Sequence, residues 1–107
     1  MRNKAGQTAL HLHTFAGNIG CVVTLLSYGA DIDAQDLNGN TCLHLAVSRT
    51  NIDIAKALLV FGANVNILNK SGHSARHLAA KLDGRGKYVL YLIILCQQFL
   101  FLLKKSY

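Results

Sequence analysis

Hydrophobic and polar residues alternate along the chain in blocks whose spacing fits short amphipathic helices. Thr8 and Thr41 each precede a first block, where a hydroxyl can accept a hydrogen bond from a free backbone N–H group and so cap a helix. Each threonine therefore predicts the start of a short helix. The residues expected to form the buried stripe are Leu10, Leu12, Leu43, Leu45 and Ala46.

A second helix is predicted after Asn18 and after Asn51, because asparagine is a favourable N-cap residue. Gly29 and Gly62 end these helices, since the residue after a helix commonly needs a positive φ, which costs glycine little. The Asp- and Asn-rich run that follows each glycine is typical of a hairpin-like loop. The predicted apolar faces are Ile19, Val22, Leu25 and Leu26 in the first copy and Ile52, Ala55, Leu58 and Leu59 in the second.

The whole pattern recurs after 33 residues. A period of 33 residues with a T-x-L-H core resembles the ankyrin repeat. The resemblance implies an all-α solenoid of helix-turn-helix units joined by hairpin-like loops. The residues that recur as its structural motif are Gly6, Thr8, His11, Gly29, Gly39, Thr41, His44, Gly62, Gly72, Ser74 and His77.

The period also divides the chain into units. Repeat solenoids normally carry polar capping units at both ends, whereas Met1 to Lys4 lead straight into the first motif, so we expect further chain upstream. The predicted units are the N-terminal residues 1–3, ankyrin repeats at 4–36 and 37–69, a degenerate third repeat at 70–96 and an apolar and basic tail at 97–107.

The histidines are predicted to be structural. His11, His44 and His77 occupy the same position in successive repeats, and packed helices stand roughly 8–10 Å apart, whereas zinc needs ligands at about 2 Å. Equivalent histidines cannot converge on one ion, so we expect them to hydrogen-bond the loops and brace adjacent repeats. His13 lies outside this pattern and fits either local repacking or a partner surface. No metal or cofactor is expected.

The three cysteines, Cys21, Cys42 and Cys96, lie in apolar helical positions. We expect small core residues in a reducing compartment, with a redox or acylation role for Cys96 as the alternative. Residues 72–76 begin like a G-x-S-x-G nucleophile motif but end in Arg76, and Ser74 aligns with the capping threonines. No catalytic residue is predicted, so this chain is not expected to be an enzyme.

The charge is concentrated in the second part of the chain. Residues 1–66 carry four basic and four acidic side chains, so residues 67–107 hold the whole net charge of +6. The basic residues are not interleaved with aromatic residues, which disfavours nucleic-acid binding. An acidic partner or an anionic membrane surface fits better. We expect a cytoplasmic protein, with peripheral membrane association through its C-terminal segment as an open alternative.

The stretch from Tyr88 to Leu103 is almost entirely apolar. Three alternatives remain open for its end: packing on a following segment or a partner, insertion into one membrane leaflet, and a non-native ending from alternative splicing or an imprecise gene model. Sixteen residues of helix span about 24 Å, short of the ~30 Å hydrocarbon core of a bilayer. The residues expected to form the outer helix of a third repeat are Tyr88, Leu90, Tyr91, Leu92 and Ile94.

A closer resemblance narrows the family. The segments Lys56–Ala63, Ser74–Ala80 and Lys87–Leu92 are similar to the last ankyrin repeats of calcium-independent patatin-like phospholipases, of the group VI phospholipase A2 type. In that family a lipase domain with a G-x-S-x-G nucleophile follows the repeats and hydrolyses glycerophospholipid esters. Neither of its catalytic motifs occurs here, so the resemblance implies a regulatory or assembly region without its enzyme.

Two function classes follow. The first is a protein–protein interaction module that binds a protein partner, or a second copy, through the exposed face of the inner helices and the loop tips. The second is the regulatory or membrane-targeting part of a glycerophospholipid acyl hydrolase, in which only the full-length protein is catalytic. The loop-tip residues predicted to contact a partner are Asp36, Leu37, Asn38, Asn69 and Lys70.

Overall fold

The computed structural model describes residues 2–81 and 93–95, and this part of the chain contains helices and no strand. The fold is all-α, as the repeat pattern predicts. The helices are, in chain order, α1 (Ala9–Ala16), α2 (Ile19–Ser27), α3 (Cys42–Ser48), α4 (Ile52–Val60) and α5 (Ala75–Lys81).

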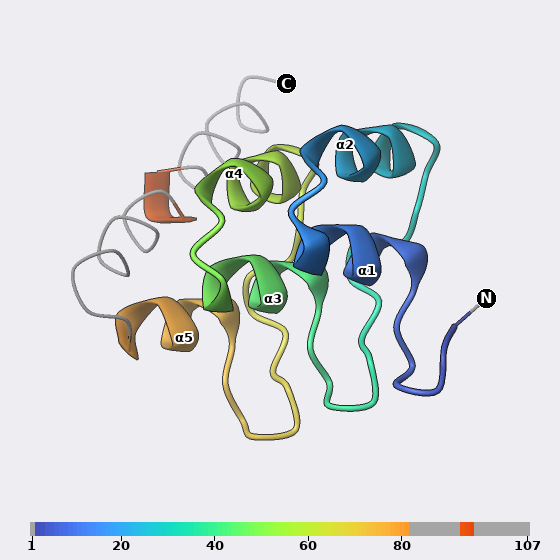
Figure 1. Ribbon diagram of the computed structural model, residues 1–107. Helices are drawn as coiled ribbons and strands as arrows, with labels where there is room; N and C mark the ends of the chain where they lie inside the picture. Colours follow the sequence, from blue (N-terminus) through green and yellow to red (C-terminus); the bar gives the residue numbers. More distant parts are fainter. Residues whose placement is uncertain (1, 82–92, 96–107) are drawn as a thin grey trace, which may run out of the picture.

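The helices form two rows (Figure 1). The inner helices α1, α3 and α5 lie side by side in one row, and the outer helices α2 and α4 form the second row above them. Each inner helix that is followed by an outer helix packs against it, as α1 does on α2 and α3 on α4. Long loops before α3 and α5 project on the side away from the outer row (Figure 1), which gives a stack of helix-turn-helix units.

The predicted N-caps of the inner helices are confirmed. The Thr8 hydroxyl accepts a hydrogen bond from the His11 backbone N–H at 3.4 Å, and Thr41 does the same for His44 at 3.3 Å. Ser74 caps α5 in the same way, with its Oγ 3.3 Å from the backbone nitrogen three residues on. Because a hydroxyl satisfies one of the free N–H groups at each start, the helices begin where the sequence predicts.

The outer helices begin in two different ways. Asn51 caps α4 as predicted, since its Oδ1 accepts from the Ile54 N–H at 3.1 Å. The same prediction is wrong for Asn18, whose side chain makes no capping bond to α2. Its Nδ2 lies 3.3 Å from the His13 Nδ1, a contact that Ala46 cannot offer at the equivalent place before Asn51. We infer that this contact at the amide nitrogen holds the Asn18 side chain away from the capping position.

The core lies between the two rows of helices. Leu10, Leu43 and Ile54 are among its fully buried side chains, and Gly29 and Gly62 end the outer helices at φ 86° and 94°, as predicted. Leu12 was expected to be buried but is 47% exposed. Two residues after Leu10, it lies about 200° around the helix and away from the core. Leu45 and Ile52 are half-buried, and Ile19 is exposed at the start of α2.

Only Ile93 to Leu95 are described beyond α5. Ile93 is fully buried and joins the core cluster, whereas Ile94, one of the residues expected to form a third outer helix, is helical and 38% exposed. The other predicted members of that helix, Cys96 and the tail 97–107 lie outside the described residues.

Candidate interaction surface

The repeated histidines connect successive repeats. The Nε2 of His11 lies 2.9 Å from the carbonyl oxygen of Asn40, and the Nε2 of His44 lies 2.9 Å from that of His73. In each case the histidine belongs to an inner helix and the carbonyl to the loop that leads into the next one. The prediction that these histidines brace adjacent repeats is confirmed for both. His77 makes the same local bonds to Ser74.

The bonds of His44 fix its tautomer. Its Nδ1 accepts the Thr41 backbone N–H at 3.0 Å, so the ring hydrogen must sit on Nε2, which donates to the His73 carbonyl. Burial lowers the pKa of His44 below its usual 6.5, and the backbone bond to His73 only partly opposes this. The ring is therefore a neutral structural brace.

Two of the predicted partner residues shape the loop tips. Asp36 is 9% exposed, and its Oδ1 accepts from the backbone N–H groups of Asn38 and Asn40, both at 2.9 Å. Asn69, one period later, accepts from Ser71 and His73 in the same manner at 3.0 Å. These oxygens hold the loops in their bent form.

The other three predicted tip residues present their side chains to solvent. Leu37 is 58% exposed, and Asn38 and Lys70 are also exposed. Their backbones join neighbouring loops, because the Lys70 N–H donates to the Asn38 carbonyl at 3.0 Å. Gly39 lies so close to this junction that an added Cβ would be 2.8 Å from the Lys70 nitrogen. The tips are thus fixed in position while three side chains stay free for contacts.

A second link between repeats, which the sequence did not predict, involves Arg2 and Gln35. The Arg2 guanidinium donates to the carbonyls of Gly6 at 2.8 Å and Gln35 at 2.6 Å. The Gln35 side chain, 33 residues later, donates to Gly39 at 2.9 Å and Leu68 at 3.1 Å. Arg2 and Gln35 therefore both link their own loop to the next one, although they are different residue types. The spacing of 33 residues between them is the one sequence feature that indicates this shared role.

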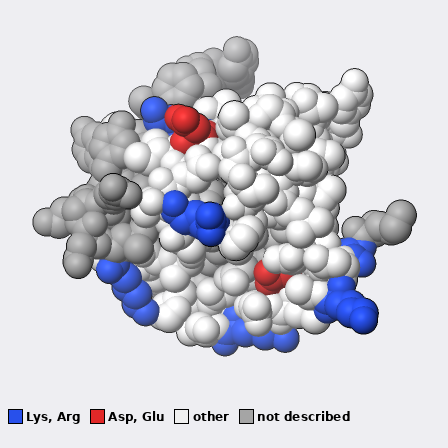
Figure 2. All heavy atoms as spheres, in the orientation of Figure 1, with Lys and Arg blue, Asp and Glu red and all other residues white. Residues whose placement is uncertain are grey.

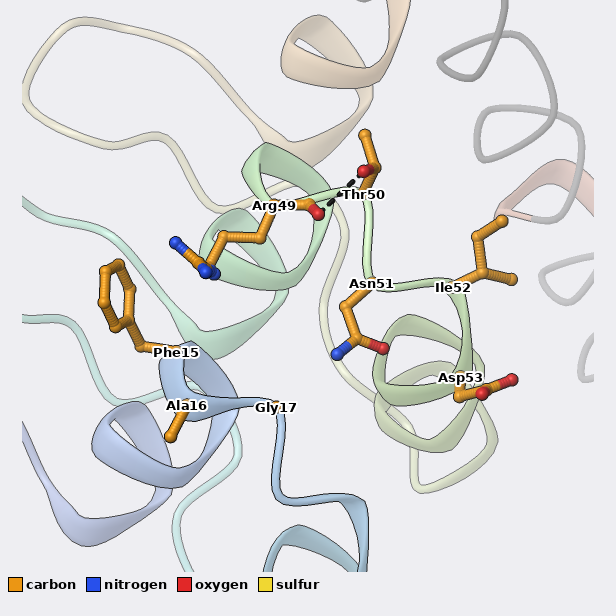
Figure 3. Close-up of a pocket in the computed structure, with 8 residues that line it drawn as sticks. All are labelled: Phe15, Ala16, Gly17, Arg49, Thr50, Asn51, Ile52 and Asp53. Atoms are coloured by element: carbon orange, nitrogen blue, oxygen red, sulfur yellow. Dashed lines mark hydrogen bonds between the residues drawn. The ribbon is translucent and has the colours of Figure 1, made fainter.

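An open cleft of about 590 Å³ lies where the ends of α1 and α3 meet the start of α4 (Figure 3). In it, the Arg49 guanidinium stacks on the Phe15 ring, with Cζ 4.3 Å from the ring centroid. Thr50 follows with a φ of 52°, and no other residue of the described segments apart from glycine has a positive φ. The repeat pattern of the sequence gives no signal for this cleft. Its lining residues are Phe15, Ala16, Gly17, Arg49, Thr50, Asn51, Ile52 and Asp53.

Exposed basic residues lie in the loops before α1 and α5, on α5 and at the end of α3, whereas the loop before α3 carries Asp31, Asp33 and Asp36 and no basic residue. Figure 2 shows Lys and Arg atoms spread over one face of the molecule, with fewer Asp atoms among them. Of the exposed acidic residues in the described segments, none belongs to an inner helix, and Asp36 in the loop before α3 is nearly buried. We call the following exposed residues the basic side of the stack: Arg2, Lys4, Arg49, Lys70, Arg76 and Lys81.

The two described cysteines have different environments. Cys42 is fully buried, as expected, and burial raises the pKa of its thiol to about 12. A thiol with this pKa stays protonated and is a poor nucleophile. Cys21, expected in the core, is exposed on α2. The repeat period assigns Cys21 the place of buried Ile54, but in the described chain no repeat covers it.

Within residues 2–81 and 93–95, no three His, Cys or Asp side chains come together as they would around a metal ion. No helix in these segments is long and apolar enough to cross a membrane.

Comparison with protein families agrees with this geometry. A family model described as ankyrin repeats in three copies matches residues 10–99. The chain belongs to the ankyrin-repeat family, whose repeats mediate protein–protein interaction and are generally non-catalytic. No curated protein matches the chain.

Proposed function

We propose that this chain is a cytoplasmic binding module that contacts a protein partner through its loop tips and inner helices. The main support for the proposal is that some loop side chains fix the shape of the tips while others are exposed to solvent. Asp36 and Asn69 hold the tips in place, while the side chains of Leu37, Asn38 and Lys70 project into solvent. An exposed leucine on a rigid loop adds apolar contact area at little further entropic cost.

The repeat organisation supports this assignment. The proposed repeats at 4–36 and 37–69 each contribute one inner and one outer helix, and the proposed third repeat at 70–96 contributes α5. Each tip is bonded to the next through the backbone, so the exposed residues form a row of fixed spacing. A partner, or a second copy of the chain, would contact several tips at once.

Site-specific photo-crosslinking tests the proposal. A photoreactive phenylalanine analogue is placed at position 37, on the tip, or at position 60, on the outer helix α4. Leu37 and Val60 are both well exposed, at 58% and 69%, so the two sites are matched in access. We expect a discrete crosslinked partner from position 37 alone. Equal crosslinking from both positions would contradict the proposal.

A second candidate function follows from the sequence resemblance to calcium-independent phospholipases. In that case the repeats would position or oligomerise a catalytic domain, and the basic C-terminal segment would help it reach an anionic membrane. The test is the intact mass of the endogenous protein, captured with an antibody to residues 38–69 and assayed for phospholipid hydrolysis. A species much heavier than 11.6 kDa with acyl-hydrolase activity would favour this candidate. An inactive species of 11.6 kDa would exclude it.

A further inference from the structure

We propose that the cleft between the ends of α1 and α3 binds an acidic peptide segment, with a carboxylate on Arg49 and an apolar side chain against Phe15. The proposal rests on the proposed binding function and names the chemistry of the partner. Its basis is the shape, donors and charge of this cleft.

The Arg49 side chain is preoriented for binding a carboxylate. Its guanidinium is stacked on Phe15 with Cζ 4.3 Å from the ring centroid, which restricts the side chain before any ligand arrives. In the described part of the chain it makes no ion pair and no side-chain hydrogen bond, so its N–H groups remain available. A stacked guanidinium still presents its edge, and that edge matches the two oxygens of a carboxylate.

Asn51 adds a second donor to the cleft. Its Oδ1 is occupied by the Ile54 N–H at 3.1 Å, which leaves the Nδ2 directed toward Gly17 (Figure 3). Gly17 keeps the space open, since an added Cβ would lie 3.6 Å from that nitrogen. The Asp53 side chain also lines the cleft but is turned away from Phe15 (Figure 3). Donors therefore face the Phe15 side, and the one acidic group points elsewhere.

Phe15 provides the apolar part of the site. It is 53% exposed, and the equivalent position in the second repeat is Ser48, so the repeat does not require an aromatic residue there. Exposed Leu12 lies three residues earlier on the same helix and extends the apolar strip. A peptide side chain can cover this strip while its neighbour reaches Arg49.

The charge around the cleft favours an acidic ligand. Arg49 is the one cation that lines the cleft, and the Asp53 side chain, also in the lining, is turned away from Phe15 (Figure 3). Such an arrangement attracts acidic segments and disfavours basic ones. The cleft is open and has a volume of about 590 Å³, which leaves room for a short stretch of side chains.

The first test is selection from a phage library of random linear peptides on the full-length chain. We expect enriched peptides to combine Asp or Glu with an adjacent apolar residue. Selection is repeated on R49Q, which should no longer enrich this class. Enriched peptides without an acidic bias, or with the same bias on R49Q, would overturn the proposal.

The second test measures affinity with a fluorescein-labelled peptide of glutamates flanking a single leucine. We expect R49Q to weaken binding about tenfold, the loss of one charge-assisted hydrogen-bonded pair. Lys56→Gln removes the same charge from outer helix α4 and should change the affinity by less than about twofold. F15A should also weaken binding. Equal losses in R49Q and K56Q would show unspecific charge attraction and overturn the site.

Two controls separate this inference from the function on which it rests. Unfolding curves of each variant show whether the repeats remain folded, and R49K keeps the charge while losing the planar fork, so it should not restore full affinity. Binding of phosphatidylserine vesicles through Arg49, without binding of the peptide, would overturn the acidic-peptide assignment. A wild-type chain that crosslinks a partner at position 37 but binds no acidic peptide would overturn this site and leave the proposed binding module standing.

Discussion

Thr50 is the residue at which the chain departs most clearly from its own repeat. It occupies the position of Gly17, and both adopt the left-handed region, at φ 52° and 80°. For a β-branched residue this region costs about 1–2 kcal/mol. The Thr50 hydroxyl reaches only the adjacent Arg49 carbonyl at 2.7 Å (Figure 3), which makes no link to another element.

We predict that Thr50→Gly raises the free energy of unfolding by about 0.5–1 kcal/mol, because glycine removes the strain but gives the unfolded chain more entropy. Urea denaturation followed by circular dichroism measures this change in the free energy of unfolding. The reciprocal change Gly17→Thr should destabilise the fold, although space is available, since its nearest new contact would be 3.6 Å from the added Cβ. A neutral effect of both changes would show that the turn relaxes.

His44 gives the stability of the fold a pH dependence of known sign. Burial lowers its pKa in the native state below 6.5, so the unfolded chain binds the proton first. The contribution of neutral His44 to the free energy of unfolding is complete above pH 6.5 and is lost as the pH falls through the lower native pKa. We predict that the unfolding midpoint in urea falls between pH 7.5 and 5, and falls less in His44→Gln. The same slope in both proteins would assign the effect to other groups.

At the scale of the element, the starts of α2 and α4 differ in one contact, which joins the side chains of Asn18 and His13. Asn51→Ala should cost about 1 kcal/mol, the usual value of an N-cap, while Asn18→Ala should cost clearly less because Asn18 makes no cap bond. Removing the competing ring in His13→Ala should release Asn18 to cap α2. In that background Asn18→Ala should become as costly as Asn51→Ala. A double-mutant cycle measured by thermal unfolding tests this. If the effects of His13→Ala and Asn18→Ala simply add, His13 does not compete with the start of α2 for the Asn18 side chain.

The helices and braces of this fold were predictable because they depend on local chemistry. A threonine three residues before a histidine sets both the cap and the link to the next loop, and the period repeats it at His11 and His44. Exposure was less predictable, since it depends on which repeat lies alongside. The cleft was missed because Phe15 and Arg49 break the period, and a repeat pattern gives no signal for residues that depart from it.

At the scale of the whole molecule, the two complete repeats differ in what covers them. Cys42, Ile54 and Leu58 are fully buried in the second repeat. Their counterparts in the first repeat are Ala9 and Cys21, which are exposed, and Leu25, which is half-buried. Repeat 1 covers the face of repeat 2, and the same face of repeat 1 is open. A cleft of about 200 Å³ at Ala9 and Leu25 lies on it.

This difference predicts that a consensus ankyrin repeat fused in register before residue 4 will stabilise the chain. Burying Leu25 and its neighbours should add about 3 kcal/mol, because repeat stability is a sum of units and nearest-neighbour interfaces. The unfolding free energy in urea measures the gain, and protection of the Cys21 thiol from a labelling reagent reports that this face is covered. A matched fusion with charged residues on its facing side should give neither effect. If both fusions stabilise alike, the gain comes from the added repeat itself and not from the face that carries Cys21.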